Sequence, residues 1–381
     1  MSETIFTNAH IVTRQESFLG DVVVRDGLVA GVEPALRPSA APGAVDLEGD
    51  FLLPGLIELH TDNLERHAAP RPRVRWPALS AVIGHDAQMA ASGITTIYDA
   101  LAIGDVQRGG DRIDMLDRMV RAVIEAQDAG VLRADHFLHL RCELSFADLR
   151  ELIARLAVHP MVGLISLMDH TPGQRQFVSL DQFKTYYQVK YNLTDEAVAD
   201  FVRSRQADQE CYAADNRTAV IALAREHGIR LASHDDATAA HIAEAQEAGA
   251  IIAEFPTTHE AAAAARAAGM SVIGGAPNVV RGGSHSGNAS ALDFARAGLL
   301  DILSSDYAPV SLLHAAFMLT DSAGISLPDA VATASANPAE AMGLADRGRI
   351  APGLRADLVR VGVVDALPFV RATWRLGQRI A

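Results

Sequence analysis

The sequence of 381 residues contains only two cysteines, Cys142 and Cys211, which argues against a disulfide scaffold and indicates a reducing cytoplasm. It also lacks an apolar stretch near the roughly 20 residues that span a bilayer, and its first residues lack the basic and apolar regions of a signal peptide. A basic excess is absent as well. The net charge of −14 disfavours a nucleic-acid partner but leaves small anionic substrates open.

Lysine is nearly absent too. Of the 33 basic residues, only Lys184 and Lys190 are lysines. A coding bias toward arginine explains most of this shortage. Two lysines in one short segment nevertheless indicate positions where an arginine would not serve, because a compact ammonium and a planar guanidinium bind ligands differently.

What is present is a chain of 49% hydrophobic residues in which two β-rich ends flank an alternating middle. The ends, residues 1–53 and 346–381, are expected to form one small β-sandwich domain. In residues 54–345, short apolar strands alternate with helical patterns, which is typical of a parallel β/α architecture. The eight predicted strands are Gly55–Leu59, Thr95–Asp99, His136–Leu140, Gly163–Leu167, Arg230–Ala232, Ile251–Glu254, Ser271–Gly274 and Asp301–Ser304.

Eight such units predict a (β/α)₈ barrel. An open, doubly wound sheet is the main alternative, and the lack of a glycine-rich dinucleotide fingerprint after the first strand disfavours it. Glycines such as Gly93 and Gly249 follow several helical patterns, where a left-handed residue ends a helix.

Imidazole and carboxylate side chains gather at the predicted strand ends, the edge where barrels place their active sites. Taken singly, each has an ordinary explanation as a salt-bridged surface residue or a helix cap. Their shared placement favours one or two divalent metal ions, which such ligands suit. The residues are His60, Asp62, Asp99, Arg141, Glu143, Asp169, His170, His234, Asp235, Asp236, Glu254 and Asp306.

A basic loop follows the first predicted strand, within a strongly acidic protein. Its cationic residues, without an acidic one between them, include Arg66, Arg71 and Arg73, and guanidinium groups bind phosphates bidentately. A solvated loop or a subunit contact would carry the same residues. We expect a phosphorylated, anionic substrate.

Two later segments support that expectation. Lys184 and Lys190 lie in the long stretch after the fourth predicted strand, and long loops in compact barrels are usually functional. Ser284 and His285 lie in a glycine-rich stretch after the seventh strand, where barrels often bind phosphate through backbone N–H groups. These four residues are further candidate substrate ligands.

Framing segments give the chain a resemblance that covers nearly its whole length. "FTNAHIVT" with "DVVVRDGLVAGV", "DLEGDFLLPGLIELHTDN" and "RGRIAPGLRADLVRV" together resemble the amidohydrolase superfamily. The resemblance implies one or two divalent ions, with zinc favoured and manganese or magnesium as alternatives. The ligands that it implies are His60, Asp62, Glu143, His234 and Asp306.

The chain departs from the common pattern of this superfamily in three ways. Its first motif is His-x-Asp instead of His-x-His, and no lysine lies near the ends of strands three and four. The usual histidine after strand six is also missing, and His170 or His259 is the candidate replacement. The number of metal ions therefore stays open.

A narrower set of motifs is similar to a diphosphatase branch of the superfamily that acts in phosphonate degradation. These motifs are "HLRCELS", "MDHTPGQRQF", "ASHDDAT", "AEFPTT", "NVVRGGSHSGN" and "SSDY". The resemblance implies hydrolysis of a ribose 5-triphosphate to the 5-phosphate and diphosphate. Asp306 is the favoured general base, with Glu143 and His170 as the other candidate catalytic residues.

Two rival functions remain at this stage. One is an ordinary amidohydrolase that cleaves a C–N bond, against which the basic loop argues. The other is a barrel without catalysis, against which the nearly complete ligand set argues. A homo-oligomer is compatible with the sequence, whereas membrane and nucleic-acid partners are not expected.

Overall fold

A computed structural model describes residues 3–35, 41–71, 74–104, 112–173, 175, 194–283 and 288–381. The chain divides into two compact units. The terminal unit comprises Met1–Asp99, Met119–Phe137 and Gly274–Ala381, and the middle unit comprises Ala100–Arg118 and Leu138–Ile273. Across the described segments, no helix has the length and apolar character needed to cross a membrane.

Eight parallel strands form one sheet in their sequence order, and all eight predicted strands are confirmed. A backbone bridge between Thr61 and Asp306 links the first strand to the segment after the last, so the sheet is nearly closed. The predicted (β/α)₈ barrel is therefore correct. Its strands are β6 (Leu56–Thr61), β7 (Ile94–Ile103), β8 (Asp135–Glu143), β9 (Val162–Met168), β10 (Arg230–His234), β11 (Ile252–Glu254), β12 (Ser271–Gly275) and β13 (Ile302–Ser304).

Helices connect these strands, and local side chains fix their ends. The hydroxyls of Thr194, Thr238 and Thr258 accept N–H groups at three helix starts, and left-handed glycines end two of those helices. The helices are α1 (Asn63–Ala68), α2 (Ala78–Ala91), α3 (Arg112–Asp128), α4 (Leu149–Leu156), α6 (Asp195–His227), α7 (Ala239–Ala248), α8 (His259–Ala267), α9 (Ala276–Arg281), α10 (Ala291–Arg296), α11 (Ser311–Ala323), α12 (Leu327–Ala332) and α13 (Ala336–Ala341).

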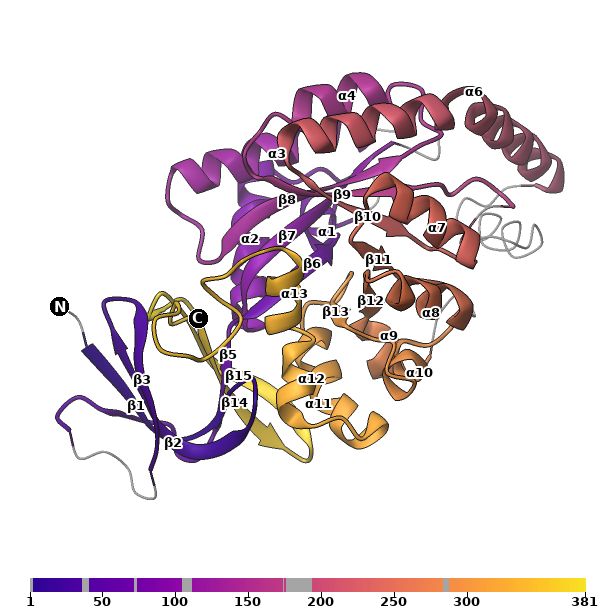
Figure 1. Cartoon of the computed structure of the whole chain (residues 1–381). Helices are drawn as coiled ribbons and strands as arrows, with labels where there is room; N and C mark the ends of the chain where they lie inside the picture. The colour runs from indigo at the N-terminus through magenta and orange to yellow at the C-terminus, as the bar shows by residue number, and fades with distance from the viewer. Residues whose placement is uncertain are drawn as a thin grey trace. The chain divides into compact units, whose positions relative to one another are not determined.

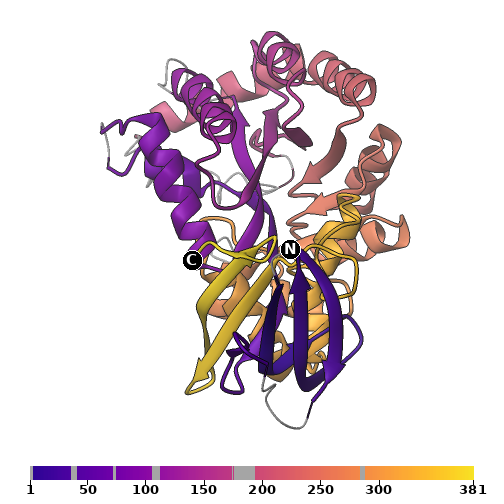
Figure 2. The ribbon, with the colours of Figure 1, turned by 90° about the vertical axis from the view of Figure 1, so that its left-hand side faces the viewer.

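A second sheet in the terminal unit combines both ends of the chain, as the sequence predicts. Its order is β16-β15-β14-β5-β1-β2-β3, with β4 beside β1. Figures 1 and 2 show the N-terminal strands in indigo beside the C-terminal strands in yellow. The strands are β1 (Glu3–Val12), β2 (Ser17–Arg25), β3 (Leu28–Pro34), β4 (Val45–Asp46), β5 (Phe51–Pro54), β14 (Leu358–Val364), β15 (Leu367–Arg375) and β16 (Gln378–Arg379).

This second sheet curls around its own core. Phe6 on β1 and Trp374 on β15 are separated by two intervening strands, yet their rings pack edge to face with centroids 4.8 Å apart. Phe6 and Ile11 of β1, Val22 and Val24 of β2, and Leu358 of β14 belong to the same apolar cluster. The sheet therefore curls so that β1 and β15 both contact this cluster.

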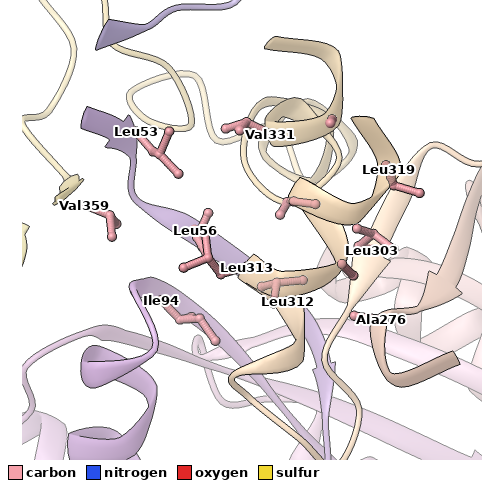
Figure 3. Packing of buried hydrophobic residues seen from close by; sticks show 14 of the residues in the cluster. Leu53, Leu56, Ile94, Ala276, Leu303, Leu312, Leu313, Leu319, Val331 and Val359 are labelled. Atoms are coloured by element: carbon pink, nitrogen blue, oxygen red, sulfur yellow. The ribbon is translucent and has the colours of Figure 1, made fainter. Parts of the chain in front are cut away.

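A further apolar core of the terminal unit lies around the start of the first barrel strand. Leu53 and Leu56 pack there with Leu312, Leu313 and Val331 (Figure 3). These side chains come from β5, β6 and helices α11 and α12, so segments distant in sequence are held together by apolar burial. The core fixes the direction in which β6 leads toward His60.

Candidate active site

In the terminal unit, three predicted metal ligands follow or end barrel strands. His60 lies within β6 and is 1% exposed, Asp62 comes two residues later, and Asp306 lies two residues after β13. The Thr61 hydroxyl donates a hydrogen bond of 2.7 Å to the Asp306 carbonyl, beside the backbone bridge between the same residues. The structure thus holds the backbones of these predicted ligands at one strand edge.

Glu58, which was not expected from the sequence, links β6 to the end of β13 at this edge through hydrogen bonds. Its buried carboxylate accepts hydrogen bonds from the backbone N–H of His60 (2.7 Å), the Ser304 hydroxyl (2.8 Å) and the backbone N–H of Ser305 (2.6 Å). Burial raises the pKa of Glu58 despite these bonds. A carboxylate among the apolar residues Leu56, Ile57 and Leu59, two residues before His60, was the available signal.

In the middle unit, His170, His234 and Asp235 form a compact group. The Oδ2 atom of Asp235 lies 3.7 Å from Nε2 of His170 and 3.6 Å from Nε2 of His234. This oxygen is buried and has no hydrogen-bond partner among the described residues. Asp235 was noted in the sequence only as one of several strand-end carboxylates.

Two glutamates orient the imidazoles of this group. The Nδ1–H of His234 donates to Glu254 (3.1 Å), and the Nδ1–H of His170 donates to Glu143 (2.7 Å). Each ring therefore turns its Nε2 atom toward Asp235. Carboxylates commonly fix metal-binding histidines in this way.

Strong electrostatic coupling links Glu143 and His170. Burial alone would raise the pKa of Glu143, but the charges of His170 and Arg205 outweigh it and lower that pKa to about 2. Burial opposes the charged form of His170 as well, yet Glu143 and Asp235 raise its pKa to about 9. For His234, burial is the largest effect and lowers the pKa, which favours a neutral imidazole.

The carboxylate of Glu143 is held by several donors, so its predicted role as a metal ligand stays a prediction. It accepts the Ser145 hydroxyl (2.8 Å) and the guanidinium of Arg205 (3.4 Å). Gly104 packs against it, because a Cβ at that glycine would lie 2.7 Å from the Cβ of Glu143. Sequence reasoning missed Arg205, which α6 brings from 62 positions away.

Left-handed backbone recurs at three strand ends. Asp235 follows β10 with φ 54°, Phe255 follows β11 with φ 51°, and Asp306 follows β13 with φ 52°. Non-glycine residues adopt this conformation rarely and at a free-energy cost. Its recurrence where side chains must turn at a strand end is typical of functional sites.

Other selected residues have less direct support. Arg66 is exposed and donates to the Tyr307 carbonyl (2.6 Å), and Arg71 is also exposed. His259 begins α8 at an exposed position, whereas its alternative, His170, lies in the middle-unit group. The remaining predicted ligands lie outside the described residues: Arg73, Lys184, Lys190, Ser284 and His285.

The strand-end position expected for Asp99 was wrong. Strand β7 continues to Ile103, so Asp99 lies in its middle. Its two carboxylate oxygens accept hydrogen bonds of 2.7 Å each, from Nε2 of His85 and Nδ1 of His136. All three side chains are completely buried.

The residues present fit a divalent cation. The separation of 3.6 Å between Asp235 and Nε2 of His234 is too long for a hydrogen bond. It matches two ligands of one ion, because bonds of about 2.0–2.2 Å at zinc place ligand atoms roughly 3.2–3.8 Å apart. In the terminal unit, the buried Oδ1 of Asp62 likewise has no hydrogen-bond partner among described residues.

Comparison with known sequences agrees with this chemistry. A family model described as "Amidohydrolase family" matches residues 87–380. The chain is 50% identical over 99% of its length to the Escherichia coli K12 protein named alpha-D-ribose 1-methylphosphonate 5-triphosphate diphosphatase, all of which is covered. It is 26% identical over its full length to all of an imidazolonepropionase from Deinococcus deserti.

Solved structures show the same fold at low identity. A 5-methylcytosine deaminase from Klebsiella pneumoniae matches with a TM-score of 0.65 at 15% identity, covering 100% of this chain and 98% of that one. An N-acetyl-D-glucosamine-6-phosphate deacetylase from Mycobacterium smegmatis matches with a TM-score of 0.65 at 17% identity, covering both chains completely. The chain therefore belongs to the amidohydrolase family, whose members are metal-dependent hydrolases.

Proposed function

We propose that this chain hydrolyses α-D-ribose 1-methylphosphonate 5-triphosphate to the 5-phosphate and diphosphate, in phosphonate catabolism. The observation that carries the proposal is 50% identity to the Escherichia coli diphosphatase over 99% of the chain. At that identity, with both chains covered end to end, the site residues and the substrate are expected to correspond. The few cysteines, Cys142 and Cys211, both free, support a reaction in the cytoplasm.

The metal ligands that we propose are those that the family resemblance implies, with one addition. In the terminal unit they are His60, Asp62 and Asp306, as the family resemblance implies. In the middle unit they are Glu143 and His234, with Asp235 as an addition suggested by its unpartnered oxygen. When bound, a zinc, manganese or magnesium ion polarises the phosphoryl group and lowers the pKa of a water molecule.

The chain's own residues supply the remaining chemistry. Asp306 accepts the proton of the attacking water, and its left-handed backbone turns it out of the strand direction. Glu143 orients His170 through the 2.7 Å hydrogen bond to Nδ1, which directs Nε2 toward Asp235. His170 is then placed to exchange a proton with a phosphoryl oxygen.

We assign substrate binding to the basic residues selected from the sequence. Arg66 and Arg71 are exposed, as residues that meet a highly charged ligand from solution would be. Arg73, Lys184, Lys190, Ser284 and His285 complete the proposed set. Their charges and N–H groups would neutralise the departing diphosphate.

The test is product analysis on the zinc-loaded and the manganese-loaded protein. Incubation with the ribose 5-triphosphate should release diphosphate and a 5-phosphate in equal amounts, with no orthophosphate. Release of orthophosphate alone would contradict the proposed cleavage position. Turnover of amides or cyclic amidines with no turnover of triphosphates would favour cleavage of a C–N bond.

A further inference from the structure

Three arginines of the middle unit reach its strand ends, and they differ in their partners. Arg175 is 7% exposed and forms ion pairs with Asp236 and Glu244. Arg205 is 5% exposed and contacts Glu143, as described above. Arg141 is half-buried and, within the described residues, makes neither a hydrogen bond nor a salt bridge.

Strand geometry places the Arg141 side chain on the functional face of β8. Successive side chains of a strand point to opposite faces, so His139, Arg141 and Glu143 share one face. His139 contacts the Ser166 hydroxyl, and Glu143 contacts His170. Arg141 therefore lies between two residues that both point into the polar group of the middle unit.

The positive charge of Arg141 acts on the group formed by His170, His234 and Asp235. Burial is the largest influence on the pKa of His234, and the guanidinium of Arg141 lowers that pKa further. The same guanidinium helps to lower the pKa of Asp235, against the opposing effect of burial. These effects require Arg141 to be near both residues, since charge interactions weaken with distance.

Leaving a partly buried guanidinium without an acceptor is unfavourable. Its Nε atom is buried and has no hydrogen-bond partner among the described residues. An unpaired buried donor costs about 1–3 kcal/mol, and more when it is charged. The Nε atom of Arg205 is likewise buried without a partner, but other nitrogens of Arg205 and Arg175 pair with internal carboxylates. Among the described residues no carboxylate pairs with Arg141 in this way, which indicates an acceptor supplied by a ligand.

We propose that Arg141 binds the phosphoryl group that becomes the 5-phosphate of the product. The planar guanidinium donates parallel hydrogen bonds to two non-bridging oxygens of that group, next to the His170, His234 and Asp235 side chains. This inference rests on the proposed function, because the proposed function defines which phosphoryl group of the substrate stays in the product. It gives Arg141 a different role from the exposed basic loop: Arg141 would bind the phosphoryl group that stays on the ribose, and the loop would contact the departing diphosphate.

The experiment measures binding of ribose 5-phosphate to the zinc-loaded protein by calorimetry. Arg141→Gln should bind about 10- to 100-fold more weakly, as expected when charged hydrogen bonds are lost. Arg141→Lys should lie between this variant and the wild type, because it keeps the charge and loses the fork. The matched control is Arg155→Gln, which removes an exposed guanidinium paired with Asp117 in the same unit.

The control should bind like the wild type, although it loses the same charge. Equal affinities for Arg141→Gln and Arg155→Gln would overturn the proposal. Loss of zinc from Arg141→Gln would overturn it too, because the residue would then support the metal instead of the phosphate. If Arg141→Gln fails to fold, unchanged affinity in Arg141→Lys contradicts the bidentate contact, and a loss supports it.

The same assay keeps this inference separate from the proposed function. If the wild type releases no diphosphate from the ribose 5-triphosphate, the proposed function fails. In that case, weaker binding of ribose 5-phosphate by Arg141→Gln but not by Arg155→Gln would still support a phosphate contact at Arg141. If diphosphate is released but the affinities are equal, the function stands and the assignment of Arg141 fails.

Discussion

Among the described residues, two groups combine two histidines with one aspartate, and they differ in how many polar atoms are satisfied. In the terminal unit, His85 and His136 donate to the two oxygens of Asp99. The other ring nitrogens are also occupied, that of His85 by the Asn63 amide (3.0 Å) and that of His136 by Asp86 (3.4 Å). The group is completely buried and internally complete.

The middle-unit group of His170, His234 and Asp235 is built from the same residue types but is left incomplete. Its glutamate partners use only the Nδ1 atoms, and Oδ2 of Asp235 has no hydrogen-bond partner among the described residues. Residue type alone therefore does not separate a structural network from a ligand site. The arrangement of unsatisfied atoms does, because buried polar groups are normally paired.

Removing one histidine from each group should give the largest difference between the two groups. We expect His234→Ala to lose turnover and bound zinc while the chain stays folded, since it removes a proposed ligand and one hydrogen bond, that to Glu254. His136→Ala should keep zinc and turnover in the fraction that remains folded. Metal analysis with activity assays measures both, and an unchanged zinc content in His234→Ala would refute its role as a ligand.

The second test makes the same substitution at two aspartates of the terminal unit. With saturating zinc, Asp306→Asn should lose about 10²–10⁴-fold in rate, the usual contribution of a positioned general base. Asp99→Asn should change the rate little. Recovery of Asp306→Asn to near wild-type rates on adding zinc or manganese would show that Asp306 only ligates the metal.

The free energy of unfolding should fall more on substitution in the terminal-unit group than in the middle-unit group, the opposite of the order for activity. Asp99→Asn leaves the imidazolium of His136 without one of its two carboxylates, and breaking a buried ion pair costs about 3–5 kcal/mol. Asp235→Asn in the metal-free protein should cost less, because it removes no hydrogen bond to Oδ2. Urea unfolding measures both values, and equal losses would remove the distinction between the two groups.

The last test concerns the pH dependence of stability. Burial opposes a charge on His136, but Asp99 and Asp86 outweigh it and raise its pKa from 6.5 to about 9. The resulting stabilisation is complete below pH 6.5 and is lost as the pH rises to 9, on the order of 3 kcal/mol in total. A His136→Gln variant should lack this decline, and an identical urea profile in both proteins would contradict the assignment.

Local patterns were sufficient to predict the barrel. Each strand is a short apolar run before a turn, so its location needs no knowledge of distant residues. The error at Asp99 arose because a charged residue was taken to end a strand. All ten residues of β7 are buried, and Asp99 is tolerated there only because His85 and His136 bind it.

The supporting shell of the site could not be predicted in the same way. Arg205 reaches Glu143 from α6, and Glu254 reaches His234 from the neighbouring strand. These pairs depend on which face of a 33-residue helix is buried and on strand register, which periodicity does not specify. Glu143 and Glu254 were found from the sequence as strand-end residues, whereas Arg205 and the pairing of Glu254 with His234 were not.

The curled terminal sheet has a consequence for how the chain folds during synthesis. Strand β5 pairs with β14, so Pro54 meets Leu358 about 300 residues later. At about 5–20 residues per second, the edge of β5 waits roughly 15–60 s on the ribosome for its partner. Unpaired edges can recruit other chains, so this interval is when the nascent protein is most exposed to aggregation, and when chaperone binding to Phe51–Pro54 would matter most.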